Sequence, residues 1–273
     1  MTGTPAFESV AIIGLGEAGA VFAHGFHAAG TRRITAFDIK SETPAGAREI
    51  DATAAPLGAV ACASPAEAVA GAALVVSLVT ASSAIAAATR AASHLGPGQT
   101  WLDLNSVGPE AKREIARIVS ARGADMVEGV AMDTVPASGI RVPLLLCGPT
   151  AEPLAARLAA AGLDATALGT AYGLAASAKL CRSVVVKGME AILLSAFDAA
   201  RAVGSEEILC ASLHRSFPGL DWAAMETTAR DRVSRHGARR AAEMHEAARM
   251  LTSLGQDHAL CTAVADRHAA GAG

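Results

Sequence analysis

Phe7-Glu-Ser-Val-Ala-Ile-Ile13 is followed by Gly14-Leu-Gly16-Glu-Ala-Gly19 and then by an apolar-periodic run from Ala20 to Ala29. This order predicts a strand, a glycine turn and a helix. Gly14 permits the tight turn, Gly16 lets the backbone approach phosphates, and Gly19 lets the helix pack close to the strand. The helix N-terminus presents N–H groups and a partial positive charge to an anion. The stretch therefore predicts a dinucleotide site, although a glycine-punctuated turn without a ligand has the same pattern.

A second β-rich segment, Arg33 to Phe37, ends in Asp38, 19 residues after Gly19. This is the position of the acid that binds the adenosine ribose hydroxyls in such folds. A carboxylate there repels the 2′-phosphate of NADP, so we expect NAD to be preferred. Lys40 and the pair Arg32-Arg33 could soften this preference, which leaves NADP possible.

Strands alternate with helical stretches through the first 170 residues, which predicts a Rossmann-type, doubly wound, mainly parallel sheet. From Tyr172 onward only helical periodicity is found, beginning with a stretch from Gly173 to Val203. We therefore expect an α/β dinucleotide-binding domain over 1–170 and an all-helical substrate and dimerisation domain over 171–273. The later strands are expected at 58–62, 74–78, 100–104, 125–132, 143–147 and 165–168, and the later helices at 82–94, 109–122, 151–161, 205–216, 221–253 and 257–270.

Composition narrows the class of protein. The 273 residues are 52% hydrophobic but only 3% aromatic, and the net charge of −3 comes without a basic block. These values argue against nucleic acid as the main partner. The five cysteines have no spacing suited to zinc, so no metal site is expected, and we predict reduced thiols in the core. No signal peptide is visible, and the apolar segment 69–89 divides into a strand and a helix, so we expect a cytoplasmic protein without a membrane span.

Only four of the 23 basic residues are lysines: Lys40, Lys112, Lys179 and Lys187. At ~100° per residue, Lys179 shares a broad polar helix face with Arg182, Ser183 and Glu190, while Lys187 lies about 80° further round. A solvent-facing stripe would give the same pattern. A lysine in a cleft can instead exchange a proton with a hydroxyl or carbonyl oxygen as hydride moves. We expect Lys187 to matter much less than Lys179.

At these residues the chain resembles the β-hydroxyacid dehydrogenase family, which is related to 6-phosphogluconate dehydrogenase. The segment 14–19 is similar to its cofactor signature, and Asp103-Leu-Asn-Ser106-Val-Gly-Pro109 is similar to its motif of an Asp, small polar residues and a Pro. Gly173-Leu-Ala-Ala-Ser-Ala-Lys179 has the spacing of its glycine-containing helix start and catalytic lysine. The resemblance implies that Lys179 is catalytic. The C-terminal helices look like a subgroup with a compact domain of unassigned role.

The cofactor residues expected from the motif and from the strand ends are Gly14, Leu15, Gly16, Glu17, Ala18, Gly19, Asp38, Lys40, Val79, Thr80 and Asn105. For Asn105 and Ser106 the alternative is a cap for the helix that begins at Pro109. The expected substrate residues are Ser106, Met132, Asp133, Thr134, Arg182, Ser183, His236 and Arg240. This set departs from the family at two places: Ser183 replaces its Asn, and Met132-Asp133-Thr134 replaces its Ser-Gly-Gly loop. The reaction class therefore transfers better than the substrate.

His236, Arg239 and Arg240 form a basic cluster that could bind a substrate anion, or could be a solvated face with Glu243 and Glu246. The long amphipathic helices have more apolar surface than one small bundle covers, so we expect a homodimer.

The leading functional hypothesis is a nicotinamide-dependent oxidoreductase acting on a small hydroxy compound, with a hydroxy acid as first choice. An imine reductase of the same fold is the alternative, although such enzymes typically lack the lysine. A catalytically inactive dinucleotide-binding regulator is the third hypothesis, which Met132 and Ser183 favour and Lys179 opposes.

Overall fold

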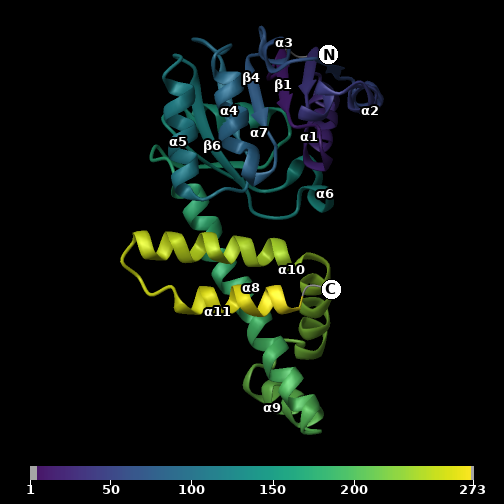
Figure 1. Cartoon of the computed structure of the whole chain (residues 1–273), viewed down its shortest axis with the longest axis vertical. Coiled ribbons are helices and arrows are strands. Elements are labelled where there is room, and N and C mark those ends of the chain that lie inside the picture. The colour runs from purple at the N-terminus through teal and green to yellow at the C-terminus, as the bar shows by residue number, and fades with distance from the viewer. Residues whose placement is uncertain (1–4, 272–273) are drawn as a thin grey trace. The chain divides into compact units, whose positions relative to one another are not determined.

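The computed structural model describes residues 5–271, and they divide into two compact units between Ser177 and Ala178. The strands are β1 (Ser9–Ile13), β2 (Arg33–Phe37), β3 (Val60–Ala61), β4 (Leu74–Ser77), β5 (Thr100–Asp103), β6 (Asp125–Ala131), β7 (Leu144–Cys147) and β8 (Ala165–Gly169). The helices of the first unit are α1 (Glu17–Ala28), α2 (Pro44–Ala54), α3 (Pro65–Val69), α4 (Ala84–Ala92), α5 (Pro109–Ser120), α6 (Val135–Ser138) and α7 (Ala151–Ala160). The C-terminal helices are α8 (Leu174–Ala202), α9 (Glu206–Ser216), α10 (Trp222–Ser253) and α11 (Ala259–Ala270) (Figure 1).

One eight-stranded sheet forms the centre of the first unit, in the order β3-β2-β1-β4-β5-β6-β7-β8. All neighbouring pairs are parallel except β6 and β7, which pair antiparallel with Glu128 opposite Cys147. The connection between β6 and β7 contains only α6 and a short 3-10 turn, and this is too little for the crossover that a parallel pair needs. The expected Rossmann-type, mainly parallel sheet is therefore confirmed.

Both faces of this sheet are covered by helices. Val10 and Ile12 of β1 pack into one apolar cluster with α1, α2 and α7, whereas Ala11 and Ile13 pack into another with α3, α4 and α5. Because successive side chains of a strand point to opposite faces, a strand buried on both sides is apolar throughout. Small aliphatic residues fill most of this core, and Trp101 is its largest fully buried side chain.

The second unit contains helices only. Leu180 of α8, Met244 of α10 and Val264 of α11 belong to its main apolar cluster, and α11 returns beside the second arm of α10 (Figure 1). The sequence predicted one continuous helix over 221–253. The structure instead kinks α10 at His236, whose φ of −136° and ψ of 15° are not helical. The two arms let α10 contact α9 with one end and α11 with the other.

Two further expectations meet the structure here. The cysteines are all free, but Cys181 is exposed, so the prediction that the thiols pack in the core is wrong for this residue. Cys181 lies on α8, and the helical periodicity of the sequence did not indicate which face of this helix other helices would cover. Between residues 5 and 271, no helix is long and apolar enough to cross a membrane.

Candidate dinucleotide site and lysine cluster

The glycine turn between β1 and α1 has two glycines that the chain itself requires. Gly14 has a φ of +94°, and a Cβ there would lie 2.5 Å from the Leu78 carbonyl oxygen. A Cβ on Gly19 would lie 2.0 Å from the Gly14 carbonyl oxygen. Both positions therefore exclude any other residue, whether or not a ligand binds.

Gly16 is different, because its backbone is extended (φ −78°, ψ −164°) and any residue could adopt it. Among the described residues, a Cβ at this position would meet no heavy atom within 4 Å. Gly16 is also the N-cap of α1, and no side chain of the described chain caps the helix there. The first N–H groups of α1, beginning at Glu17 and Ala18, thus lie at a positive helix end that no side chain of the described residues caps. This fits the pyrophosphate of a dinucleotide.

Asp38 lies beside this turn, directly after β2. Its Oδ2 accepts a hydrogen bond from the Leu15 N–H at 2.9 Å, and its Oδ1 accepts one from the Lys40 N–H at 3.0 Å. A carboxylate has about four lone-pair sites, so two N–H donors leave room for ribose hydroxyls. The expected cofactor acid and glycine turn are therefore brought together.

The basic residues near Asp38 are engaged elsewhere. Lys40 forms an ion pair with Glu49 at 2.6 Å, and Arg32 forms one with Glu8 at 3.2 Å. The Arg33 guanidinium donates to the Ala70 carbonyl at 2.6 Å. The hydrogen bond and the charge of Glu49 raise the pKa of Lys40, and the charge of Asp38 adds to this rise, so Lys40 still interacts with Asp38.

Asn105 follows β5 and connects two strand ends. Its Oδ1 accepts from the Val79 N–H at 2.7 Å, and its Nδ2 donates to Ser77 Oγ at 2.9 Å and to Asp103 Oδ2 at 2.8 Å. Both amide hydrogens are used inside the protein, so Asn105 acts by holding the turn at Val79. It does not cap α5, whose N-cap is Gly108 without a side-chain bond in the described chain. Thr80, the next turn residue, donates to Ser83 Oγ at 3.0 Å.

The structure adds a buried ion pair that the sequence analysis missed. Lys112 Nζ donates to Asp103 Oδ1 at 2.6 Å, to the Asp103 carbonyl at 2.8 Å and to the Gly129 carbonyl at 3.0 Å. Both side chains are 0% exposed. A signal existed, because Lys112 has the same helical register as Ile115, Ala116 and Val119, which are the buried face of α5.

Glu128 of β6 is the second buried group that was missed. Its carboxylate accepts from the Gly173 N–H in a short hydrogen bond and from the Ala176 N–H at 2.7 Å. Burial raises the pKa of Glu128, while these two hydrogen bonds and the charge of Lys112 act in the opposite direction. A strand residue thus caps the N-terminus of α8 and complements the helix dipole.

The expected substrate loop has mixed surroundings. Met132 packs against the apolar cluster that contains Val130 and Cys147, and its N–H donates to the Pro143 carbonyl at 2.9 Å. Asp133 is exposed and accepts from the Thr134 N–H at 2.7 Å, and Ser106 is exposed as well. Met132 therefore contributes packing at the position where the family has its carboxylate-binding serine.

Within the second unit, Lys179 is partly buried on α8. Ser183 is buried and accepts from Lys187 Nζ at 3.2 Å, whereas Arg182 is exposed. Lys187 is buried, with an ion pair to Glu243 at 2.6 Å. The polar face that was expected to be shared is thus divided into exposed and buried residues. A substitution of Lys187 is an unsuitable control for one of Lys179, because removing a buried, paired charge leaves its partner uncompensated.

The expected basic cluster on α10 is also divided. Arg240 is buried in an ion pair with Glu190, which also contacts Arg232 at 3.2 Å. Arg239 pairs with Glu243 at 2.6 Å. His236 is exposed at the kink. Both arginines thus have carboxylate partners, and each of these carboxylates is shared with a second cation, Arg232 for Glu190 and Lys187 for Glu243.

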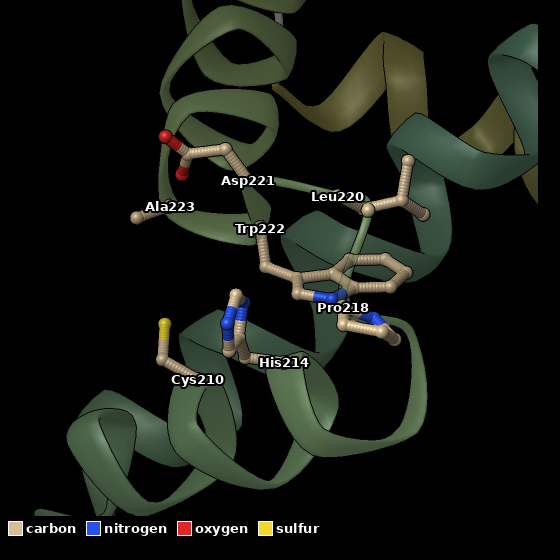
Figure 2. Close-up of a pocket in the computed structure, with 8 residues that line it drawn as sticks. Cys210, His214, Pro218, Leu220, Asp221, Trp222 and Ala223 are labelled. Carbon is tan, nitrogen blue, oxygen red and sulfur yellow. The ribbon is translucent and has the colours of Figure 1, made fainter.

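A pocket of about 490 Å³ lies at the corner between α9 and α10. Figure 2 shows Cys210 and His214 on α9 facing Trp222 and Ala223 at the start of α10. In the described residues no cluster of three or more His, Cys, Asp or Glu could hold a metal ion.

Comparison with known proteins agrees with this geometry. The family "NAD binding domain of 6-phosphogluconate dehydrogenase" matches residues 9–138, and "Domain of unknown function (DUF1932)" matches residues 200–270. A conserved hypothetical protein from Sinorhizobium meliloti 1021 has a solved structure with 36% identity and a TM-score of 0.85, over 98% of this chain and 91% of that chain. The chain therefore belongs to the family that joins this NAD-binding domain to DUF1932. A search of the curated proteins found no match.

More distant solved structures share the fold. A 3-hydroxyisobutyrate dehydrogenase from Mycobacterium tuberculosis, with L-serine, has 19% identity and a TM-score of 0.78, over 96% of this chain and 93% of that chain. A reductive aminase from Aspergillus terreus, in complex with NADPH and ethyl levulinate, has 22% identity and a TM-score of 0.59, over 95% and 91%. The resemblance to 6-phosphogluconate dehydrogenase-like proteins, with a C-terminal domain of unassigned role, is confirmed.

The contrast between two glycines gives a test of the dinucleotide site. We expect Gly16→Ala to keep the thermal midpoint of the wild type, because its Cβ meets nothing, but to bind NAD at least about tenfold more weakly. Gly19→Ala is the matched comparison and should lower the thermal midpoint, because its Cβ collides with Gly14. Calorimetry and NAD titration measure both effects, and wild-type NAD affinity in Gly16→Ala would contradict the assignment.

Proposed function

We propose that this protein is an NAD-dependent oxidoreductase that interconverts a small hydroxy compound, with a hydroxy acid as first choice, and its carbonyl form. The observation that carries the proposal is a lysine, Lys179, at the start of the helical unit that follows an NAD-binding domain of the 6-phosphogluconate dehydrogenase type. The open helix end at Gly16 and the carboxylate of Asp38 support dinucleotide binding. Lys179 favours alcohol chemistry over the imine reduction named for some proteins of this fold.

A bound nicotinamide ring supplies the hydride acceptor. In the oxidative direction the carbinol C–H bond breaks with its electron pair, and the O–H bond breaks as the C=O bond forms. The neutral amine of Lys179 accepts the hydroxyl proton, directly or through a water. In the reverse direction the ammonium returns this proton to the oxygen. The preferred direction depends on the substrate.

Lys179→Met should lower turnover by ~10²- to 10⁴-fold, the usual contribution of general acid–base catalysis. The dissociation constant for the dinucleotide should stay nearly unchanged, because the proposed role concerns the substrate oxygen. A panel of hydroxy acids, followed at the absorbance of reduced nicotinamide, measures turnover.

Arg249→Met is the matched control, because Arg249 is an exposed cation that pairs with a neighbouring residue of its own helix, Glu246, at 2.5 Å. Its turnover should equal that of the wild type. Near-wild-type turnover in Lys179→Met would contradict the mechanism, and oxidation of amines but not of hydroxy acids would favour the imine reductase. Dinucleotide binding without turnover of any substrate would favour the regulatory protein.

NAD should bind more tightly than NADP, because the carboxylate of Asp38 and a 2′-phosphate repel each other and Lys40 is paired with Glu49. A difference of roughly tenfold corresponds to about 1.4 kcal/mol. Asp38→Asn removes the charge but keeps an acceptor for the Leu15 N–H, so it should narrow the gap, while Asp51→Asn on α2 should not. Equal or tighter binding of NADP by the wild type, measured by titration, would overturn the preference.

The proposed assembly is a homodimer formed by a second copy of this chain. Val185, Met189 and Ile192 of α8 fall within about 40° of one line along the helix, and Val203 follows directly after the helix. They are exposed, Val185 by 61%, Ile192 by 62% and Val203 by 77%. A two-fold axis lets the same stripe cover itself on the partner, which is the usual geometry of a symmetric dimer.

The double variant Val185→Glu/Ile192→Glu should therefore be monomeric in light scattering at micromolar concentration, because it places charges in the stripe. Ile208→Glu is the control, since Ile208 is equally exposed but lies on α9. A monomeric wild type would refute the dimer.

A further inference from the structure

Glu243, in the domain of unknown function, lies between cations from two helices. Its Oε2 is 2.6 Å from Lys187 Nζ on α8, and its Oε1 is 2.6 Å from the Arg239 guanidinium on its own helix, α10. Its side chain is 25% exposed and that of Lys187 only 7%. The carboxylate therefore forms a partly buried bridge between α8 and α10.

Lys187 has contacts to residues of three helices, α8, α10 and α11. Its ammonium also donates to Ser183 Oγ at 3.2 Å, and its backbone carbonyl contacts the ring of His268, on α11, at 3.1 Å. Lys179, Ser183 and Lys187 follow one another at intervals of four residues, so they form one row along α8. Lys179 is the first residue of this row, and Glu243 contacts the row at its last residue, Lys187.

The charges of this row act on one another. Burial opposes ionisation of Glu243, but the cations Lys187, Arg239 and Lys179 hold its pKa below the usual value. Burial also lowers the pKa of Lys187, Glu243 opposes this, and Arg240 and Arg239 add to it. A Coulomb interaction is reciprocal, so the carboxylate that Lys179 stabilises must stabilise the Lys179 ammonium equally.

Glu190 and His268 are further titratable groups near this row. Glu190 faces Arg240 and Arg232, so its charge is balanced away from Lys179. The pKa of His268 is lowered, by burial first and then by the charges of Arg240, Lys187 and Arg267, so its ring is neutral at pH 7. Glu243 is the carboxylate that pairs with the row at Lys187, and it shares its single charge with Arg239.

We propose that Glu243 is a positioning residue for Lys179: it anchors Lys187 and compensates the positive charge of the lysine row, and so sets how readily the Lys179 amine takes up a proton. This gives a chemical role to a residue of the domain of unknown function. The inference rests on the proposed function in one respect: the proposed function makes this proton the one that Lys179 exchanges with the substrate. The charge coupling between Glu243 and Lys179 does not depend on it.

The experiment uses the small number of lysines. Reductive methylation with ¹³C-formaldehyde labels accessible lysine amines of the full chain and retains their charge. The chain contains four lysines, so the ¹³C signal of Lys179 can be assigned by its loss in Lys179→Arg. Glu243→Gln should lower the pKa of Lys179 by about one unit, because an opposite charge is removed. Glu246→Gln, on the same helix but paired with Arg249, should leave it unchanged.

Superimposable titrations of Lys179 in wild type and Glu243→Gln would overturn the proposal. If Glu243→Gln fails to fold, the reciprocal measurement applies: Lys179→Met should raise the pKa of Glu243, followed by its ¹³C carboxyl signal and assigned with Glu243→Asp. An unchanged Glu243 titration would be equally decisive against the proposal.

Kinetics separate this inference from the proposed function. Where a substrate is turned over, the acid limb of the kcat/KM profile in the oxidative direction should move to lower pH in Glu243→Gln. A protein that oxidises no substrate but shows the shifted Lys179 titration would refute the proposed function and retain the charge coupling.

Discussion

The ion pair between Asp103 and Lys112 is the constraint on which the carboxyl edge of the sheet depends. Both side chains are 0% exposed, and Lys112 donates three hydrogen bonds that join the end of β5 to the carbonyl of Gly129 in β6. Removing one partner of a buried pair typically costs ~3–5 kcal/mol, because the remaining charge stays buried. The contact therefore fixes the two strand ends relative to each other, and the loss of either partner alone would destabilise the fold.

Further polar contacts extend from this pair in both directions. Asp103 also accepts from Asn105, which in turn holds the Val79 N–H at the end of β4. Glu128, whose carboxyl feels the charge of Lys112, caps the start of α8 through Gly173 and Ala176. One buried polar layer thus defines both the turn beside the glycine motif and the first residues of the helix that leads to Lys179.

Much of the first unit could be predicted from sequence. The bounds of β2 agree with the prediction, and the other strands differ from it by a few residues, because parallel strands buried on both faces are continuous apolar runs. Asp38 was expected beside the glycine turn, since the acid of this motif follows β2, and it does contact Leu15. Helix α2 was missed, although Thr43 caps it and Pro44 is its first residue.

What could not be predicted were the partners of buried charges. Periodicity placed Lys179, Arg182, Ser183 and Glu190 on one face, but a helix face is defined relative to its own axis only. The side of α8 that α10 and α11 cover depends on tertiary packing, and this packing buries Lys187 and leaves Arg182 exposed. The kink at His236 likewise decides that Arg240 meets Glu190, and no local pattern specifies it.

The buried pairs of the helical unit call for an explanation other than stability. Lys187–Glu243 and Arg240–Glu190 both join α8 to α10, and apolar residues of similar volume at such positions are often neutral or more stable. Helices that pack through alanine and other small side chains can shift along one another, because few of their contacts distinguish one register from the next. Two ion pairs do distinguish registers, since a shift of one residue would separate the charges and leave them buried. They therefore fix how α10 lies along the row of α8 that begins with Lys179.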